Sequence, residues 1–370
     1  MKVIVACAGT GGHINPGIAI ANSIIKNEPN SKIIFVGTKT GMENDLVKNA
    51  GYEIKQIRAG RLHRTITLEN IKNMVNAYLG IADAKKIIKE FKPDIIIGTG
   101  GFICVPVMLA AKKLKVPYIL HESNVYPGLS VKLVAKNASK ILVGFEDAKK
   151  RLKEFNPICT GTPAKFDVKD IERLDKQNCI KELGLEKKAN NKKIVFVTGG
   201  SQGAIKFNET VISMIKKYKP EDVFFVIATG HQNYDKVLEQ IKGYENIDKY
   251  LQVEKFIYRM DKMYKAADLL ITRAGAMTLT ELSITRKPAI LIPLPTAAEN
   301  HQLFNAKSME NVGAGIVIEE NVLNEDVLYD KIKEMIADDK ILQTMGENTV
   351  KLYRPNVEQK IYNEIKLVVK

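Results

Sequence analysis

The chain has 370 residues, about twice the size of a common domain, so two domains are expected. No apolar run approaches the roughly 18 to 20 residues of a membrane-spanning helix, although apolar residues make up 45% of the sequence. The net charge of +14 is typical either of a protein with an anionic partner (nucleic acid, an acidic membrane surface or a phosphorylated substrate) or of a solvated surface with no specific partner, and charge alone does not choose between them.

The N-terminal segment and the cysteines point to a cytoplasmic protein. Val3–Cys7 predicts a first strand and lacks the longer apolar run and cleavage site of a signal peptide. The cysteines are scattered, with no C-x-x-C pair and no clustered histidines, so they predict reduced, buried thiols rather than zinc ligands or disulfides. They are Cys7, Cys104, Cys159 and Cys179.

Short apolar runs alternate with segments of helical spacing, such as Ile18–Ile25 and Ile81–Phe91, in the first half of the chain. Continuous Ile and Val runs between helices are typical of a parallel sheet that is covered on both faces. The predicted strands are Val3–Cys7, Lys32–Val36, Asp94–Ile97, Pro117–Leu120 and Lys140–Val143.

The same pattern begins again after Asn178–Asn191, a polar, lysine-rich stretch that predicts an exposed loop. The second set of predicted strands is Ile194–Thr198, Val223–Ala228, Tyr250–Val253, Leu269–Thr272, Ala289–Ile292 and Gly315–Ile318. Two successive arrays predict two Rossmann-like α/β domains, with ligands at the carboxyl ends of the strands. We expect the domains to span 1–163 and 164–351, and a last helix at about 352–370 to pack back on the first domain.

Three glycine-rich loops, Gly9–His13, Gly98–Phe102 and Thr198–Ala204, follow predicted strands and precede helical segments. Glycines there allow a tight turn, and they expose N–H groups that can hold anionic oxygens at a helix N-terminus. A single loop of this kind is often only a tight turn. Three in one chain, two of them near-copies, favour binding of a phosphate-bearing ligand.

The first loop does not fit a dinucleotide-binding dehydrogenase. Ile14 stands where the third glycine of G-x-G-x-x-G belongs, and the second strand ends at Val36-Gly37-Thr38 without the acid that would bind the ribose. The P-loop pattern is missing as well. His13 ends the loop, where it either caps backbone groups or serves in proton transfer near neutral pH.

In the second half, a buried strand ends at Thr272 and a turn of small residues, Ala274–Ala276, opens a helix. Its free N–H groups suit a diphosphate. Glu281 lies within two turns of that helix start, where its carboxylate can accept hydrogen bonds from two ribose hydroxyls. After the next strand, the loop Thr296–Asn300 leads to polar residues placed to meet a sugar, His301 and Gln302.

Together these segments resemble the MurG family of N-acetylglucosaminyltransferases, glycosyltransferase family 28, over nearly the whole chain. The resemblance rests on both Gly-Thr-Gly-Gly loops, His121–Asn124, Pro127–Leu129, Gly199–Ala204, Arg273–Glu281 and Asn300–Ala306. It implies the GT-B fold, with two Rossmann-like domains facing a deep cleft. The first domain would bind the acceptor and touch the membrane, and the second would hold the donor.

The activity implied by the resemblance is an inverting transfer in peptidoglycan synthesis. N-acetylglucosamine would pass from UDP-N-acetylglucosamine to the C4 hydroxyl of undecaprenyl-diphospho-N-acetylmuramoyl-pentapeptide. The enzyme would work as a peripheral protein at the cytoplasmic face of the cell membrane.

The resemblance also implies roles for individual residues. His13 and Glu122 would be catalytic, with His13 the favoured base and His121 a rival. The donor would meet Thr10, Gly11, Gly12, Asn124, Lys165, Ser201, Ile257, Ala276, Met277, Thr278, Glu281, His301 and Gln302. The acceptor would meet Thr10, His13, Gly100, Gly101 and Asn124. Three positions depart from the family pattern, namely Ser123, Val131 and Lys165.

No metal ion and no other cofactor is expected. Many glycosyltransferases neutralise the leaving diphosphate with a metal held by D-x-D, and no two aspartates of this chain stand two positions apart. Backbone N–H groups at Gly200-Ser201 and Ala276-Met277 can do this electrostatic work instead.

The stretch from Arg58 to Lys92 mixes basic and apolar residues, which fits reversible binding to an anionic membrane surface. Its basic residues are Arg58, Arg61, Arg64, Lys72, Lys85, Lys86, Lys89 and Lys92. Its apolar residues are Ile66, Leu68, Met74, Val75, Tyr78, Leu79 and Ile81. The alternative is an ordinary amphipathic helix packed on the sheet with a solvated face.

Two other GT-B readings stay open at this point: a diacylglycerol glycosyltransferase and a UDP-N-acetylglucosamine 2-epimerase. A basic nucleic-acid-binding protein is a different class. The chain carries none of the RNP, KH, zinc-finger or helix-turn-helix patterns, so no nucleic acid partner is expected.

Overall fold

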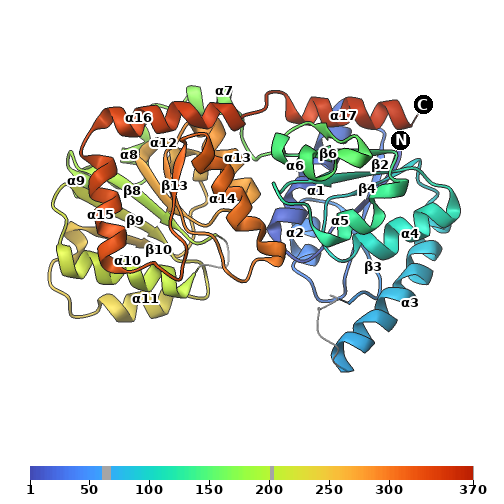
Figure 1. Cartoon of the computed structure of the whole chain (residues 1–370), viewed down its shortest axis with the longest axis horizontal. Coiled ribbons are helices and arrows are strands. Elements are labelled where there is room, and N and C mark those ends of the chain that lie inside the picture. Colours follow the sequence, from blue (N-terminus) through green and yellow to red (C-terminus); the bar gives the residue numbers. More distant parts are fainter. Residues whose placement is uncertain (61–67, 201–203, 370) are drawn as a thin grey trace. The chain divides into compact units, whose positions relative to one another are not determined.

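The computed structural model describes residues 1–60, 68–200 and 204–369, and the chain forms two compact units (Figure 1). The first unit combines Met1–Lys165 with Arg354–Lys370, and the second is Phe166–Tyr353. The division at Lys165 falls two residues beyond the end expected for the first domain. Four residues with predicted roles lie outside the described part, namely Arg61, Arg64, Ile66 and Ser201. The side chains of Leu68 and Lys72 lie outside it as well.

The first unit contains a parallel seven-stranded sheet with the order β3-β2-β1-β4-β5-β6-β7. Its strands are β1 (Lys2–Ala6), β2 (Lys32–Gly37), β3 (Glu53–Gln56), β4 (Ile95–Gly98), β5 (Tyr118–Glu122), β6 (Lys140–Val143) and β7 (Ile158–Cys159). Its helices are α1 (Gly11–Asn27), α2 (Glu43–Asn49), α3 (Leu68–Phe91), α4 (Cys104–Leu114), α5 (Leu129–Val134), α6 (Glu146–Arg151) and α17 (Val357–Val368).

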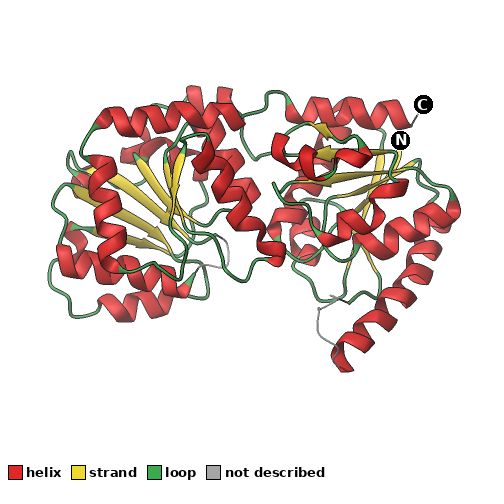
Figure 2. Cartoon of the chain, viewed as in Figure 1, coloured by secondary structure: helices red, strands yellow, loops and turns green. Residues whose placement is uncertain are grey.

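The second unit contains a parallel six-stranded sheet with the order β10-β9-β8-β11-β12-β13. Its strands are β8 (Lys193–Thr198), β9 (Val223–Ala228), β10 (Leu251–Glu254), β11 (Leu269–Thr272), β12 (Ala289–Leu291) and β13 (Gly315–Val317). Its helices are α7 (Val168–Glu172), α8 (Lys176–Glu182), α9 (Glu186–Ala189), α10 (Ile205–Tyr218), α11 (Tyr234–Ile241), α12 (Met260–Ala266), α13 (Ala276–Thr285), α14 (His301–Asn311), α15 (Glu325–Ile336) and α16 (Asp339–Asn348). Helices cover both faces of each sheet (Figure 2).

Burial on both faces explains why the strands are continuous runs of Ile and Val rather than alternating patterns. In the first unit, alternate residues of β1 enter different cores, since Ile4 packs with α4 whereas Val5 packs with α1 and α17. Ile361 and Ile365 of α17 are fully buried in that second core. Each such isoleucine stabilises the unit by about 1.5–3 kcal/mol, so α17 is an integral part of the first unit.

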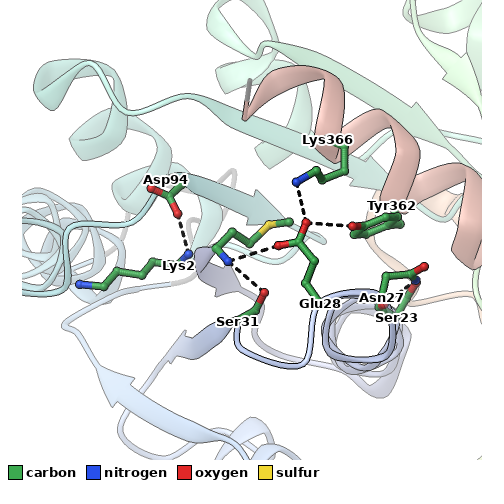
Figure 3. A network of polar contacts seen from close by, with 9 residues as sticks. Lys2, Ser23, Asn27, Glu28, Ser31, Asp94, Tyr362 and Lys366 are labelled. Atoms are coloured by element: carbon green, nitrogen blue, oxygen red, sulfur yellow. Dashed lines mark hydrogen bonds and ion pairs between the residues drawn. The ribbon is translucent and has the colours of Figure 1, made fainter.

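Polar contacts reinforce the attachment of α17, as Figure 3 shows. The Glu28 carboxylate, just after α1, accepts hydrogen bonds from Lys366 at 2.6 Å and from the Tyr362 hydroxyl at 2.9 Å. Its other oxygen lies 3.3 Å from the amino group of Met1. The Lys366 hydrogen bond is the main reason why the pKa of Glu28 falls to about 2.

The prediction of an exposed loop at Asn178–Asn191 was wrong. Most of α8 and all of α9 lie within that stretch, and Cys179, Leu185 and Ala189 are buried. Lysines between these positions hid the helical spacing, because their charged ends reach solvent while the few apolar residues face the core. Two short strands, β3 and β7, were also not predicted, since they are partly exposed edge strands without an apolar run.

In a parallel sheet all carboxyl ends lie at one edge, and the glycine-rich loops therefore gather there in each unit. Within the described residues, no helix is both long enough and apolar enough to cross a membrane.

Candidate active site

The two Gly-Thr-Gly-Gly loops meet at the carboxyl edge of the first sheet, because β1 and β4 are neighbours in it. The His13 ring lies directly against Gly100, where an added Cβ would stand 2.3 Å from Nδ1. The Thr99 hydroxyl donates a 2.7 Å hydrogen bond to the backbone carbonyl of His13. The two similar Gly-Thr-Gly-Gly segments therefore pack against each other, and the second loop forms the surface that the His13 ring contacts.

Two glycines of the second loop are required by this close packing. Gly100 and Gly101 have φ of +112° and +83°, which side-chain-bearing residues rarely adopt. A Cβ at Gly101 would also come within 2.3 Å of the carbonyl oxygen of Ala8. Both glycines therefore allow the backbones of the two loops to touch.

His13 is half-buried, and desolvation lowers the pKa of its imidazole, although a backbone hydrogen bond with Thr99 acts in the opposite direction. A lowered pKa keeps the ring neutral at physiological pH. A neutral imidazole has a nitrogen lone pair that can accept a proton. The local geometry therefore suits His13 for the role of a base.

The N-terminus of α1 lies in the same loop. Thr10 is extended and its carbonyl accepts the N–H groups of His13 and Ile14, while its side chain makes no capping hydrogen bond. No acidic residue occupies the first turn. The amides of Gly11 and Gly12 thus begin a 17-residue helix whose partial positive charge suits an anionic ligand.

Glu122 holds the loop that follows β5. One of its oxygens accepts from the backbone and side-chain N–H groups of Asn124 at 2.9 and 3.0 Å, and the other accepts from the Gly128 amide at 2.8 Å. These contacts favour a positioning role for the buried Glu122. A direct catalytic role for it stays a prediction.

His121 is fully buried, and its Nε2 donates to the carbonyl of Gly161 at 3.0 Å. Burial lowers its pKa to about 4, so the ring is neutral and enclosed. Ser123, which departs from the family pattern, lies 3.5 Å from Nδ1 through its hydroxyl. This buried environment favours a structural role for His121, and the assignment of His13 as the base stays a prediction.

In the second unit, α13 begins at the predicted diphosphate turn. Gly275 is extended at the N-cap, makes no side-chain cap, and is followed by Ala276, Met277 and Thr278 as the first helical residues. On the neighbouring strand β8, Thr198 is followed by Gly200, whose φ is +85° and whose amide lies 3.3 Å from the Thr198 hydroxyl. The start of α13 thus offers backbone N–H groups at the end of β11, which is a neighbour of β8 in the sheet.

Glu281 lies on α13 and accepts a 2.9 Å hydrogen bond from the hydroxyl of Tyr264. Tyr264 is buried in α12, and burial together with the nearby carboxylate raises its pKa well above the usual value. Tyr264 was not found by sequence reasoning, because a tyrosine within a short helix of mixed polarity belongs to no motif. It orients the carboxylate predicted to bind ribose.

Arg273 links three strand ends of this unit. Its guanidinium donates to the carbonyls of Ile292 and Pro293, at 3.2 and 3.4 Å, and forms an ion pair with Glu320 at 2.5 Å. Asn305 adds a 3.0 Å hydrogen bond from its side-chain amide to the carbonyl of Ala274. The turn before α13 is therefore fixed from two sides.

Three other predicted donor residues of the second unit, Ile257, His301 and Gln302, follow the carboxyl ends of β10 and β12. Ile257 lines a crevice of about 260 Å³, together with Phe256 and Tyr258. The Nδ1 of His301 donates to the carbonyl of Ala298, and the side-chain oxygen of Gln302 accepts the Leu294 amide at 3.0 Å. The exposed Lys165 ends the main segment of the first unit. No group of three or more His, Cys, Asp or Glu residues is arranged for metal binding in the described part of the chain.

Comparisons with known proteins show the family of the chain. Residues 3–143 match the glycosyltransferase family 28 N-terminal domain, and residues 194–361 match the C-terminal domain of that family. A UDP-N-acetylglucosamine--N-acetylmuramyl-(pentapeptide) pyrophosphoryl-undecaprenol N-acetylglucosamine transferase from Acetivibrio thermocellus is 37% identical over all of this chain and 99% of its own length. The transferase of the same name from Clostridioides difficile is 38% identical over 99% of this chain and 88% of its own.

Solved structures share the fold. MurG of Acinetobacter baumannii superposes with a TM-score of 0.76 at 25% identity and covers 99% of both chains. The S. aureus MnaA structure with UDP has a TM-score of 0.70 at 17% identity, over 99% of this chain and 96% of its own. The fold is thus that of the GT-B enzymes. The chain belongs to glycosyltransferase family 28 and is a hexosyltransferase.

Proposed function

We propose that the chain transfers N-acetylglucosamine from UDP-N-acetylglucosamine to the C4 hydroxyl of a lipid-linked N-acetylmuramoyl-pentapeptide, the step that completes the lipid-linked disaccharide of peptidoglycan. Full-length relatives named for this reaction support the proposal. The structural observation that carries it is the half-buried His13, held against Gly100 beside the N-terminus of α1.

In the proposed reaction the C4 oxygen of the acceptor attacks the anomeric carbon of the donor sugar. The bond from that carbon to the diphosphate oxygen breaks, and its electron pair leaves with UDP, so the configuration inverts. The hydroxyl proton passes to the imidazole of His13, which is neutral because desolvation lowers its pKa. Glu122 acts through the loop it holds and places Asn124 near the acceptor.

The departing diphosphate gains negative charge as the bond breaks. Amides at the start of α13, at Ala276–Thr278, stabilise this charge. Glu281, oriented by Tyr264, binds the ribose hydroxyls, and the backbone at Ile257 meets the uracil. His301 and Gln302 contact the sugar.

The test of this function is to incubate the protein with radiolabelled UDP-N-acetylglucosamine and a lipid-linked muramoyl-pentapeptide. Label in the lipid product is expected, and the transfer rate of a His13→Ala variant should be lower by a factor of about 10²–10⁴. Free 2-epimer, or labelled diacylglycerol when that lipid is offered, would overturn the proposal in favour of the other GT-B activities. A His13→Ala enzyme with near-normal turnover would reject His13 as the base.

The acceptor is a membrane lipid, and the first unit offers a surface to meet it. The exposed side of α3 carries Met74, Val75 and Tyr78, with 59%, 52% and 74% of their surfaces accessible. Lysines follow on the same helix at Lys85, Lys86 and Lys89. Apolar side chains next to cations are the composition that binds an anionic bilayer surface reversibly. We infer that the protein docks there as a peripheral protein of the cytoplasmic face.

Docking is tested by sedimentation with vesicles that contain phosphatidylglycerol, compared with neutral phosphatidylcholine vesicles. Binding to the anionic vesicles should weaken as salt rises, and Tyr78→Ser should weaken it about tenfold or more, because the ring no longer inserts. Tyr258→Ser is the matched control, since Tyr258 is 84% exposed in the second unit. Salt-independent binding, or equal effects of both variants, would contradict this docking surface.

A further inference from the structure

A second carboxylate, from Glu43, lies behind the first glycine loop and has no part in the mechanism above. Glu43 is the first residue of α2, and its side chain has no exposed surface. One of its oxygens accepts from the amide and the hydroxyl of Thr38, at 2.8 and 2.6 Å. The other accepts from the amide of Gly9 at 3.3 Å. The carboxylate thus joins the loop after β1 to the loop after β2.

The surrounding backbone is shaped to admit this carboxylate. A Cβ at Gly41 would stand 2.1 Å from Oε2 of Glu43, and a Cβ at Gly37 would stand 2.7 Å from its Cγ. Asn44 closes the same turn by donating to the carbonyls of Thr38 and Gly41 at 2.9 and 2.8 Å. Within the described residues, no lysine or arginine forms an ion pair with Glu43. A buried carboxylate without a cationic partner costs stability, so hydrogen bonding alone must hold it.

Gly9 is the residue that this bond fixes, and it directly precedes the loop's functional part. Its φ of +98° and its open surroundings leave the loop with little support from packing. Thr10, the next residue, is the N-cap of α1, and His13 follows within the first turn of that helix. A displacement of the Gly9 amide therefore moves the helix N-terminus and His13 together.

We propose that Glu43 is a positioning residue for the transfer reaction: its buried carboxylate holds the amide of Gly9 and thereby fixes the helix start and His13. The proposal rests on the function proposed above for His13. It differs from a purely structural role, because Glu43 should act on the chemical step through His13 and leave nucleotide binding in the second unit intact.

Glu43→Gln is the direct test, because the glutamine side chain has the same shape as glutamate but replaces one acceptor oxygen with an NH₂ donor. That donor would face the N–H group of either Thr38 or Gly9, so one of the two hydrogen bonds is lost. We expect kcat to fall about 10²-fold, as for a misplacement near 1 Å, while the UDP dissociation constant changes less than threefold. Gly41→Ala is a second variant that keeps the charge and pushes the carboxylate away from Gly9, and it should reproduce the loss. Glu53→Gln, on the exposed edge strand β3, is the matched control and should keep full activity.

A double-mutant cycle with His13→Ala separates positioning from general damage. If Glu43 acts through His13, the double variant should be no more than about threefold slower than His13→Ala alone. The proposal would be overturned if the losses of kcat in the two single variants multiplied in the double variant. It would also be overturned if Glu43→Gln and Gly41→Ala both kept kcat within threefold of the parent. Normal turnover of His13→Ala would instead refute the role of His13, so the two failures are distinguishable.

Discussion

Gly100→Ala offers a sharp test of the site, because the added methyl group meets the proposed base. The new Cβ would stand 2.3 Å from Nδ1 and 2.7 Å from Cε1 of His13, where ordinary contacts begin at 3.4 Å. The ring must therefore retreat by about 1 Å. A displacement of this size at a reacting group costs about 10²-fold in rate. The alanine would also sit at a φ of +112°, which adds about 1–3 kcal/mol of backbone strain.

The assay is the initial rate of label transfer to the lipid acceptor at saturating donor, with thermal unfolding measured on the same preparations. Gly184→Ala is the control for backbone strain, because Gly184 has a φ of +68° but no atom within 4 Å of the new Cβ. We expect backbone strain to destabilise both variants, the contact with His13 to add to the destabilisation of Gly100→Ala, and a loss of kcat of about 10²-fold only for Gly100→Ala. A Gly100→Ala enzyme that is folded and keeps kcat within threefold would refute the placement of His13 at the reaction centre.

Three further predictions address stability, nucleotide binding and metals. Because the pKa of Glu28 is lowered in the folded protein, its ionised carboxylate stabilises the fold above about pH 4.5, and this contribution is lost as pH falls towards 2. The Glu28→Gln variant should therefore have a free energy of unfolding in urea that is about 1–2 kcal/mol lower than that of the parent at pH 7, after allowance for solvent screening. The difference should be smaller at pH 3. An equal loss at both pH values would contradict this linkage. Tyr264→Phe should weaken UDP binding about three- to tenfold in calorimetry by releasing Glu281, and unchanged affinity would exclude that role. Chelation with EDTA should leave the transfer rate unchanged, and a loss that magnesium restores would disprove metal-independent catalysis.

The sequence predicted the sheets well, because strands buried on both faces must be apolar throughout. Lys140–Val143, Val223–Ala228 and Leu269–Thr272 have the predicted bounds, and the other predicted strands differ by a residue or two at their ends. The failures follow from the same rule. The edge strand β3 mixes charged with apolar residues, and α8 and α9 carry too many lysines to show an apolar face.

The candidate site was partly predictable. Glycine loops, His13 and Glu281 stand in recognisable motifs after strand ends, where the fold places ligands. Sequence motifs did not predict the roles of Glu43, Tyr264 and Arg273. Each of these residues acts through a contact between segments that are distant in sequence, or through a hydrogen bond to the backbone. Glu43 even follows the strand end at which the ribose-binding acid of a dinucleotide fold was sought, but its carboxylate turns inward to Gly9.

The attachment of α17 to the first unit has a consequence for synthesis of the chain. The second unit is continuous in sequence, whereas the first needs Ile361 and Ile365 to fill its core. A ribosome adds about 5–20 residues per second, so the second unit takes about 10–40 s to emerge after Lys165. Throughout that interval the core between the first sheet and α1 lacks the two isoleucines of α17. The segment translated first is therefore the last to complete its core.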